Sequence, residues 1–398
     1  MKQRTILFAW ELGGGLGHLL RFRRIAERLA AAGHRVLVVL RDLSQAHRLF
    51  PAPGIELLQA PIKTGPSPER FALPSTFAHV LFNMAFGNVD ELCALVRAWR
   101  TLVQWAEPDL IVFDHSPTAL LATRGYGAKR VLIGNGFCCP AVCSRFPDWR
   151  PWEHNDPDQL QRDEDRVLGN ANRVLEESSC PRLRRLSDLY RDVDETVLTT
   201  FAELDPFGDR GPDRYWGVWS VDLGVPPPWP ADANPRVFAY IKPSPMLPAI
   251  LEAIRAIRIP AVIFCPEVQP QLRQRFSDHR LSFCAQPVDV RQAADGCDLA
   301  ILNATLNTTA TMLLAGKPLL LVPLQLEQRL TAERVAAIGA GRFVLPNHAH
   351  EIAVCLQDML ASTRYALAAK QFAEKYVGFA GGDPAGRATE RLFQLLAP

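Results

Sequence analysis

The stretch from residue 297 to residue 342 constrains the fold more than any other part of the chain. It contains two short apolar runs, 298–302 and 318–322, and each is followed by a polar turn and a segment of helical character. Apolar runs of this length that alternate with helices are typical of strands buried in a parallel sheet. The stretch therefore predicts a strand–turn–helix repeat, and with it an α/β fold.

A helix expected at 308–315 would begin directly after the polar turn 303–307. The first N–H groups of a helix have no partner within the helix, so a helix that starts beyond the end of a strand can offer them to an anion such as phosphate. Asn307, Thr308 and Thr309 add polar side chains at this point. The same residue types are also common as ordinary helix caps, so both roles stay open.

Length and composition limit the classes of protein to consider. A chain of 398 residues exceeds what one hydrophobic core usually supports, so we expect two domains. The formal net charge of +2, without a cluster of Lys and Arg, argues against a nucleic-acid partner. No apolar run approaches the roughly 18 residues of a membrane-spanning helix. We therefore expect a soluble, cytoplasmic protein without a transmembrane segment.

The nine cysteines lie mostly in apolar stretches, as reduced thiols do. Only Cys138, Cys139 and Cys143 form a cluster, and no second group of ligands has the spacing of a zinc site. We therefore expect no metal.

The first forty residues show the same alternation of strand and helix. The expected elements are a strand at 5–9, a glycine-rich turn at 11–18, a helix at 19–32 and a strand at 36–40. A dinucleotide site needs glycines at the first, third and sixth positions of such a turn, and counted from Gly13 the sixth position is His18. The register disfavours a dinucleotide, although Asp42, where a ribose-binding acid would stand, keeps a nicotinamide enzyme as an alternative.

The remaining pattern predicts two Rossmann-like domains. Further strands are expected at 109–113, 130–133, 196–200, 236–241, 261–264 and 281–283. Helices are expected at 76–105, at 156–190 with a break near Pro181, and at 245–257, 269–276, 351–361, 364–376 and 384–396. The proline-rich segment 221–235 would be a stiff linker between a first domain, 1–220, and a second domain, 236–380. We expect residues 381–398 to form a helix that packs back on the first domain.

Several motifs resemble the nucleotide-sugar glycosyltransferases of the GT-B fold. The likeness is greatest to the UDP-glycosyltransferase superfamily and its bacterial antibiotic and lipid glycosyltransferase relatives. The residues that carry it are Gly17-His18, Asp114, Pro323, the pair Glu327-Gln328 and the segment 336–342. The resemblance implies two doubly wound parallel-sheet domains that face each other across a cleft, the first binding an acceptor and the second a nucleotide sugar.

The turn at 303–308 departs from the family's pattern, which reads His-Gly-Gly-x-Gly-Thr. Asn303 stands where the family has its donor-binding His, and the three glycines are replaced by Ala304, Thr305 and Asn307. A neutral amide forms a weaker hydrogen bond to phosphate than a charged imidazole does. Side chains in place of glycines also keep a phosphate further from the backbone. Lys242, with Ser244 nearby, is a candidate to supply the missing positive charge.

The resemblance also implies roles for individual residues. His18 would be the general base, because imidazole titrates near neutral pH, and Asp114 would orient it. His115 is a neighbouring imidazole that could be confused with it. Residues implied to bind the donor are Gly15, Gly17, Lys242, Ser244, Pro287, Val288, Asn303, Asn307, Thr308, Thr309, Glu327 and Gln328. Among them, Pro287 and Val288 would hold the base through their backbone, and Glu327 and Gln328 would contact sugar hydroxyls.

These implications together predict a metal-independent, inverting glycosyltransferase of the hexosyltransferase type. It would move a sugar from a UDP- or dTDP-sugar to a hydroxyl of a small-molecule, lipid or peptide acceptor, and it would need no cofactor beyond this donor substrate. We expect the acceptor near Glu11, Phe82, Phe86 and the loop 137–152. The altered turn leaves two alternatives: a degenerate, non-catalytic GT-B partner or regulator, and a nucleotide-sugar epimerase. The sequence gives no indication of the oligomeric state.

Overall fold

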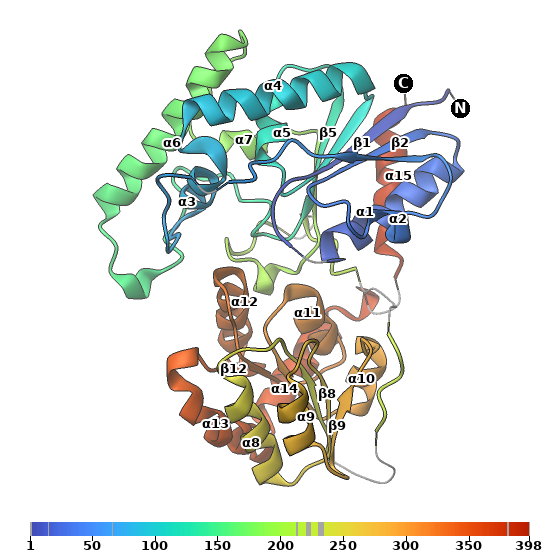
Figure 1. Cartoon of the computed structure of the whole chain (residues 1–398), viewed down its shortest axis with the longest axis vertical. Coiled ribbons are helices and arrows are strands. Elements are labelled where there is room, and N and C mark those ends of the chain that lie inside the picture. The colour runs from blue at the N-terminus through green and yellow to red at the C-terminus, as the bar shows by residue number, and fades with distance from the viewer. Residues whose placement is uncertain are drawn as a thin grey trace. The chain divides into compact units, whose positions relative to one another are not determined.

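The computed structural model describes residues 2–14, 16–65, 67–211, 214–219, 224–229, 235–379 and 382–397 (Figure 1). The chain forms two compact units. The first unit consists of Met1–Thr199, Arg210–Trp216 and Asp383–Pro398, and the second of Thr200–Asp209 and Gly217–Gly382. Residues 200–209 and 217–219, which we had assigned to a first domain ending at residue 220, thus belong to the second unit.

The first unit is built on a six-stranded parallel sheet with the order β3-β2-β1-β4-β5-β6. Its strands are β1 (Thr5–Trp10), β2 (Arg35–Leu40), β3 (Ile55–Gln59), β4 (Leu110–Asp114), β5 (Lys129–Gly134) and β6 (Glu195–Leu198). β1, β2 and β4 are almost entirely buried, as their apolar sequences predicted. The order of the strands reverses between β1 and β4. The carboxyl ends of these two strands therefore form a topological switch point, where open α/β sheets bind ligands.

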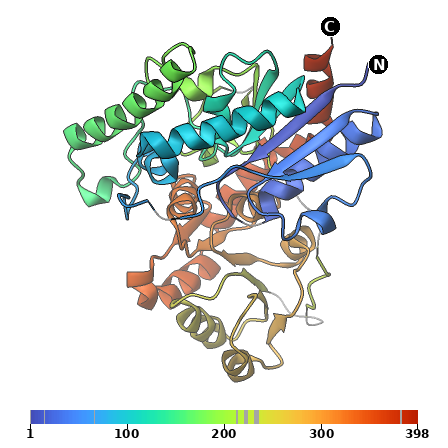
Figure 2. The same cartoon turned by 45° about the horizontal axis from the view of Figure 1, so that its top comes forward.

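The helices of this unit fall into two groups. They are α1 (Leu16–Ala31), α2 (Ala46–Leu49), α3 (Phe77–Leu81), α4 (Val89–Ala106), α5 (Pro117–Ala122), α6 (Pro157–Glu177), α7 (Asp188–Arg191) and α15 (Pro384–Leu396), with a 3-10 turn at Pro151–Glu153. α4 packs against α5 and α6, whereas α15 packs against α1 (Figures 1 and 2). Ion pairs between Arg28 and Asp383, at 2.6 Å, and between Arg391 and Glu195, at 2.7 Å, hold α15 to the unit.

The helical segment expected at 76–105 is confirmed, but it is interrupted at residues 87–88. The structure has α3, a π-helical turn at Phe82–Phe86 and then α4. The break falls at Gly87, where a Cβ atom would lie 2.8 Å from the Phe82 ring. Asn88 then caps α4, because its side chain accepts a hydrogen bond of 3.1 Å from the N–H of Glu91. Apolar periodicity alone did not reveal this glycine and cap.

The second unit contains another six-stranded parallel sheet, with the order β12-β11-β10-β7-β8-β9. Its strands are β7 (Val237–Tyr240), β8 (Ala261–Phe264), β9 (Leu281–Cys284), β10 (Leu299–Leu302), β11 (Leu319–Leu321) and β12 (Gly341–Phe343). Counted from β7, this is the strand order of the first unit. Its switch point lies between β7 and β10, which pair with Tyr240 opposite Leu302.

The helices of the second unit follow its strands. They are α8 (Leu247–Ile257), α9 (Pro270–Phe276), α10 (Val290–Gly296), α11 (Leu306–Leu314), α12 (Leu326–Ala337), α13 (Ile352–Ala361) and α14 (Arg364–Lys375), with 3-10 turns at Ala202–Leu204, Pro346–Glu351 and Val377–Phe379. α11 begins at Leu306, two residues before the expected position, after Thr305 as its N-cap residue. The start of this helix therefore lies closer to the end of β10 than the sequence indicated.

The expected linker at 221–235 lies partly outside the described residues, which here include only 224–229 and 235. Within that part, Val225 forms an isolated parallel bridge with Val288. Its N–H donates to the carbonyl of Pro287 at 2.8 Å, and its carbonyl accepts from the N–H of Asp289 at 2.9 Å. This part of the linker is therefore attached to the second unit.

Candidate active site

The switch point of the first unit brings an imidazole and a carboxylate together. His18 lies in the first turn of α1, directly after the loop from β1, and Asp114 is the last residue of β4. The Nδ1 atom of His18 lies 2.9 Å from Oδ2 of Asp114. Asp114 is fully buried, whereas His18 keeps part of its ring exposed. The structure thus places the two residues together at the carboxyl edge of the sheet, where the motifs predicted them.

The charge of Asp114 fixes the tautomer of His18. Burial raises the pKa of Asp114, but the positive charges of Arg21 and His18 outweigh burial and hold it below its ordinary value. An ionised carboxylate only accepts hydrogen bonds, so the proton of a neutral His18 sits on Nδ1. The lone pair of Nε2 is therefore free to take a proton from a hydroxyl group.

The main chain of Gly13 confines the reactive side of the His18 ring. Gly13 has a φ of 86°, and a Cβ atom at this position would lie 2.7 Å from Nε2 of His18. The carbonyl of Gly13 accepts a hydrogen bond of 2.8 Å from Arg41, and the Trp10 ring stacks on the imidazole with centroids 5.3 Å apart. Glycine is needed here both for the backbone conformation and for the space beside Nε2.

The other glycines of this turn carry less structural information. Gly15, implied as a donor-binding residue, lies outside the described residues. Gly17 stands in the first turn of α1, and a Cβ atom there would meet nothing within 4 Å. The assignment of Gly17 to the donor stays a prediction.

His115 is buried and cannot serve as the base. Burial, followed by the positive charge of His18, lowers the pKa of His115 to about 3. Its ring lies against Phe77 and Phe137, and its backbone has a φ of 49°. A general base must bind and release a proton near the working pH, which His115 does not do. Of the two neighbouring histidines, His18 is the candidate.

Glu11, Phe82 and Phe86 are not available to an acceptor, contrary to our expectation. Glu11 is 2% exposed and braces the start of α5. Its carboxylate accepts hydrogen bonds from the hydroxyl and N–H of Thr118, at 2.6 and 3.0 Å, and from the N–H of Ala119, at 2.8 Å. Burial raises the pKa of Glu11 to about 7, although these hydrogen bonds lower it. Phe82 and Phe86 belong to the hydrophobic core.

Arg21 is a site residue that the motif reading missed. It lies one turn after His18 on α1 and is 8% exposed. Its Nη2 atom lies 3.1 Å from Oδ2 of Asp114, the same oxygen that faces His18. Its Nη1 atom donates to the hydroxyl of Thr199 at 2.7 Å. The spacing of three residues on one helix face could have indicated it, since such residues are neighbours.

In the second unit, Asn303 connects the ends of three strands. Its Oδ1 accepts a hydrogen bond of 2.6 Å from the N–H of Lys242, and its Nδ2 donates at 2.9 Å to the carbonyl of Val322. The side chain is 4% exposed. Asn303 thus joins the residues that follow β7, β10 and β11. Both ends of its amide serve the main chain in this structure, and its assignment to the donor stays a prediction.

At the start of α11, the backbone N–H groups and only some of the predicted side chains can meet a ligand. Thr305 is exposed and its side chain makes no capping hydrogen bond. Asn307 and Thr308 are half-buried. Thr309 is fully buried, so its hydroxyl cannot reach a ligand in this structure, and its assignment to the donor is wrong. The N–H groups of the first turn, with Asn307 and Thr308, are the donors that an anion could meet.

Lys242 lies at the same edge as this helix. Its N–H bond to Asn303 fixes the loop after β7 beside the turn that leads into α11, and its side chain is exposed. Ser244 is half-buried, and its carbonyl accepts from the N–H of Leu247 at the start of α8. The structure therefore brings the loop that carries Lys242 and the N-terminus of α11 to one switch point, and the assignment of Lys242 to the donor stays a prediction.

The remaining predicted donor residues differ in what they can offer. The carbonyl of Pro287 accepts a hydrogen bond from Val225. The N–H and carbonyl of Val288 point away from Val225, because a parallel bridge uses the residues that flank the bridged one. Glu327 is half-buried in the first turn of α12. Gln328 is 4% exposed, and its side-chain oxygen accepts at 2.8 Å from the N–H of Leu324. Gln328 therefore braces the loop after β11.

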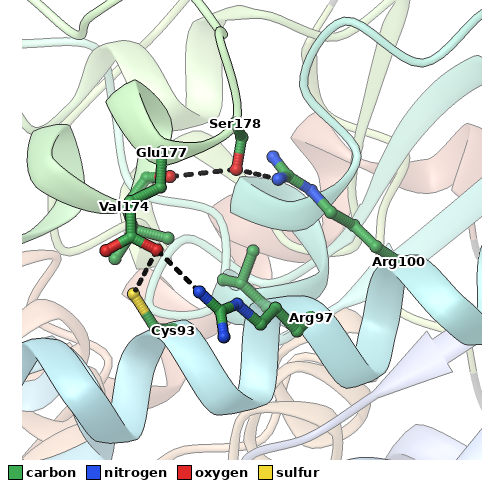
Figure 3. Close-up of a pocket in the computed structure, with 7 residues that line it drawn as sticks. Cys93, Arg97, Arg100, Val174, Glu177 and Ser178 are labelled. Atoms are coloured by element: carbon green, nitrogen blue, oxygen red, sulfur yellow. Dashed lines mark hydrogen bonds and ion pairs between the residues drawn. The ribbon is translucent and has the colours of Figure 1, made fainter.

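A cavity of about 320 Å³ lies away from these edges, between α4 and the end of α6 (Figure 3). Its polar groups are paired with one another: Glu177 meets the Cys93 thiol at 3.3 Å and Arg97 at 3.1 Å, and Arg100 contacts Ser178 and the carbonyl of Ala122. Ala122 ends α5, at the opposite edge of the sheet from Asp114. We assign no ligand to this cavity.

Curated relatives and solved structures agree with this architecture. The chain is 25% identical over 338 residues to a PGL/p-HBAD biosynthesis glycosyltransferase of Mycobacterium tuberculosis, covering 79% of this chain and 76% of the relative. It is 25% identical over 401 residues to a PGL/p-HBAD biosynthesis rhamnosyltransferase of Mycobacterium bovis, covering 89% and 88%. No family model matches the chain.

Solved structures share the whole fold. The calicheamicin glycosyltransferase CalG4 superposes with a TM-score of 0.74 at 19% identity over 100% of both chains. The spinosyn rhamnosyltransferase SpnG, solved with thymidine diphosphate, gives a TM-score of 0.65 at 18% identity over 98% of this chain and 100% of its own. The chain is a glycosyltransferase of the GT-B fold, and the resemblance and fold class predicted from the motifs are confirmed. None of its described helices is both long and apolar enough to cross a membrane.

The close approach of Gly13 to His18 generates a first prediction. Replacement Gly13→Ala should force the imidazole away from its position, because the added Cβ would lie 2.7 Å from Nε2. We expect glycosyl transfer to fall by roughly 10²-fold, the lower range of a general base's contribution. Gly14→Ala is the matched control, since a Cβ there meets nothing within 4 Å. Equal transfer rates of the two variants would contradict the prediction.

Glu11 generates a second prediction, on how the free energy of unfolding depends on pH. Its ordinary pKa of 4.5 is raised to about 7 in the folded chain, so between these values the folded state binds more protons than the unfolded state. The free energy of unfolding should therefore fall as pH rises from about 4.5 to about 7, and Glu11 should contribute about 3 kcal/mol to this fall. Urea unfolding measured across this range should show a slope that Glu11→Gln removes. An unchanged slope in that variant would contradict it.

Proposed function

We propose that this protein is a metal-independent, inverting glycosyltransferase that moves a sugar from a UDP- or dTDP-sugar to an acceptor hydroxyl, with His18 as the base and Asp114 orienting it. The observation that carries the proposal is the distance of 2.9 Å between Nδ1 of His18 and Oδ2 of Asp114 at the switch point of the first sheet. A partly exposed imidazole beside a buried, ionised carboxylate has the arrangement that a general base requires.

The proton transfer follows from this arrangement. The acceptor hydroxyl would give its proton to Nε2 of His18 while its oxygen forms a bond to the anomeric carbon and the bond from that carbon to the diphosphate breaks. The resulting imidazolium is stabilised by Asp114, which stays ionised. Attack from the side opposite to the leaving group inverts the anomeric centre.

The second unit would bind the donor. The N–H groups that begin α11 and the ammonium group of Lys242 supply positive charge for a diphosphate at the switch point between β7 and β10. The main chain of Val288 would contact the base, and Glu327 would contact the sugar. These protein groups supply charge to the leaving diphosphate, and on that ground we propose that no metal is required.

The printed names of the relatives support the substrate class. SpnG was solved with thymidine diphosphate and, separately, with spinosyn aglycone, VinC was solved with dTDP, and one of the mycobacterial relatives is a rhamnosyltransferase. We therefore propose a UDP- or dTDP-hexose as donor and a small-molecule, lipid or peptide hydroxyl as acceptor.

Nucleotide binding tests the donor side. Isothermal titration with UDP and dTDP should show binding to at least one of them, and no heat with either would remove the proposal. Lys242→Ala should weaken that binding by about tenfold, equal to about 1.4 kcal/mol. Lys370→Ala is the control, because Lys370 is an exposed lysine of α14 whose only close ion pair among the described residues is to Glu374. Binding that is equally weak in both lysine variants would assign no special role to Lys242.

Loss of the base tests the catalytic side. His18→Ala should lower the transfer rate by about 10²- to 10⁴-fold while nucleotide binding is unchanged, because His18 belongs to the first unit. Transfer is measured across a panel of phenolic, lipid and peptide acceptors, with and without EDTA. Nucleotide binding without transfer or hydrolysis would favour a non-catalytic GT-B partner or regulator, and acceptor-free conversion of one nucleotide sugar into another would favour an epimerase.

A further inference from the structure

We propose that Arg21 is a positioning residue for the base: it holds Asp114 in place and limits the proton affinity of His18. This inference rests on the proposed function, since it concerns the same dyad. Arg21 touches neither an acceptor nor a donor in this assignment and acts through Asp114. No motif used above includes it.

The geometry ties Arg21 to both members of the dyad. Its Nη2 atom lies 3.1 Å from Oδ2 of Asp114, and the same atom lies 3.3 Å from Nδ1 of His18. A guanidinium only donates hydrogen bonds, and Nδ1 of His18 carries the proton that faces Asp114. Two donors therefore meet in the contact between Arg21 and His18, and this contact is not a hydrogen bond. Both groups share one carboxylate oxygen.

A second anchor prevents Arg21 from swinging away. Its Nη1 atom donates at 2.7 Å to the hydroxyl of Thr199, the residue that follows β6. The N–H of Thr199 in turn donates at 2.7 Å to the carbonyl of Gly134, which ends β5. The rigid fork of the guanidinium thus spans from the end of β4 to the end of β6, a geometry that the single ammonium of a lysine cannot reproduce.

The charges around His18 explain what Arg21 does. Asp114 and Arg21 face the imidazole, and Arg41 and the neutral His115 add to the charges that act near it. Cys138 and Cys139 lie near Asp114 on the side of Gly134. A protonated His18 would place a second positive charge 3.3 Å from the guanidinium. Arg21 therefore opposes a positive charge on His18 by repulsion, whereas Asp114 at 2.9 Å favours it.

Arg21 also keeps Asp114 from competing with His18 for the proton of the acceptor. If His18 were the one cationic neighbour of Asp114, the buried carboxylate would be costly to keep ionised whenever His18 is neutral. The permanent charge of Arg21 removes this dependence, because an arginine is not deprotonated in proteins. The proton taken from the acceptor thus stays on His18.

The direct test is the titration of His18 by NMR, which needs no substrate. Imidazole resonances of His18 are assigned by comparison with His18→Ala and followed from pH 4 to pH 9 in the wild type, Arg21→Gln and Arg21→Lys. We expect the midpoint to rise by about one pH unit in Arg21→Gln and to stay near the wild-type value in Arg21→Lys, which keeps the charge. Equal midpoints in all three proteins would overturn the charge role.

Kinetics separate positioning from charge. Arg21→Lys should lower kcat by roughly tenfold with an unchanged KM for the donor. A lysine keeps the positive charge but cannot bridge Asp114 and Thr199 as the two nitrogens of the guanidinium do. In Arg21→Gln, the acid limb of the pH–rate profile should move upward with the NMR midpoint. Arg23→Gln is the matched control: Arg23 lies on the same helix, pairs with Glu27 at 2.8 Å and does not contact the dyad. An effect of Arg23→Gln as large as that of Arg21→Lys would overturn the proposal.

The variants distinguish this inference from the proposed function. If the wild type binds nucleotides and transfers no sugar, the proposed function fails, while the NMR midpoints still decide the effect of Arg21. If the wild type is active and Arg21→Lys keeps the full kcat, the positioning role fails alone. Should Arg21→Gln not fold, Thr199→Val replaces it: this change removes the second anchor with the charge intact, and a kcat equal to the wild type would contradict the inference.

Discussion

The buried carboxylate of Asp114 is the interaction on which the first unit's site depends. Its side chain is fully buried, and an isolated charge in such a place would cost several kcal/mol. Two cationic or partly cationic groups on α1, His18 and Arg21, offset this cost from one side. The start of α1 is therefore held to the end of β4, and the position of His18 follows from its contact with this carboxylate.

Both sheets place polar side chains at the switch point, but with different chemistry. In the first unit, Glu11 reaches across from the loop after β1 to cap α5, which follows β4. In the second unit, Asn303 reaches across from the end of β10 to the loop after β7. The two sheets share a strand order, so the same gap between strands is bridged twice. The bridge is a carboxylate that caps a helix in one case and a neutral amide that joins loops in the other.

The sequence predicted those features that follow from local pattern. Ten of the twelve strands that the structure describes were predicted because their sequences are apolar runs, and His18 and Asp114 were found because a motif marks them. The strands β3 and β12 were not predicted, because they are only partly buried. The roles of Arg21 and Thr309 were missed or misassigned because they depend on where side chains point after folding. A threonine in the second turn of a helix can face either the ligand or the core, and only packing turned Thr309 inward. Burial of Glu11 likewise depends on α5, which is distant in sequence.

The altered turn before α11 keeps a left-handed residue although its glycine is replaced. Ala304 has a φ of 61° and is fully buried. This left-handed conformation costs an alanine about 1 kcal/mol, which a glycine would not incur. Burial of its methyl group returns a similar amount, about 0.8 kcal/mol. Ala304 thus adopts a backbone conformation that a glycine reaches without this cost, and the N–H groups of α11 begin at the edge of the sheet. The loss of this glycine therefore leaves the left-handed residue before α11 in place.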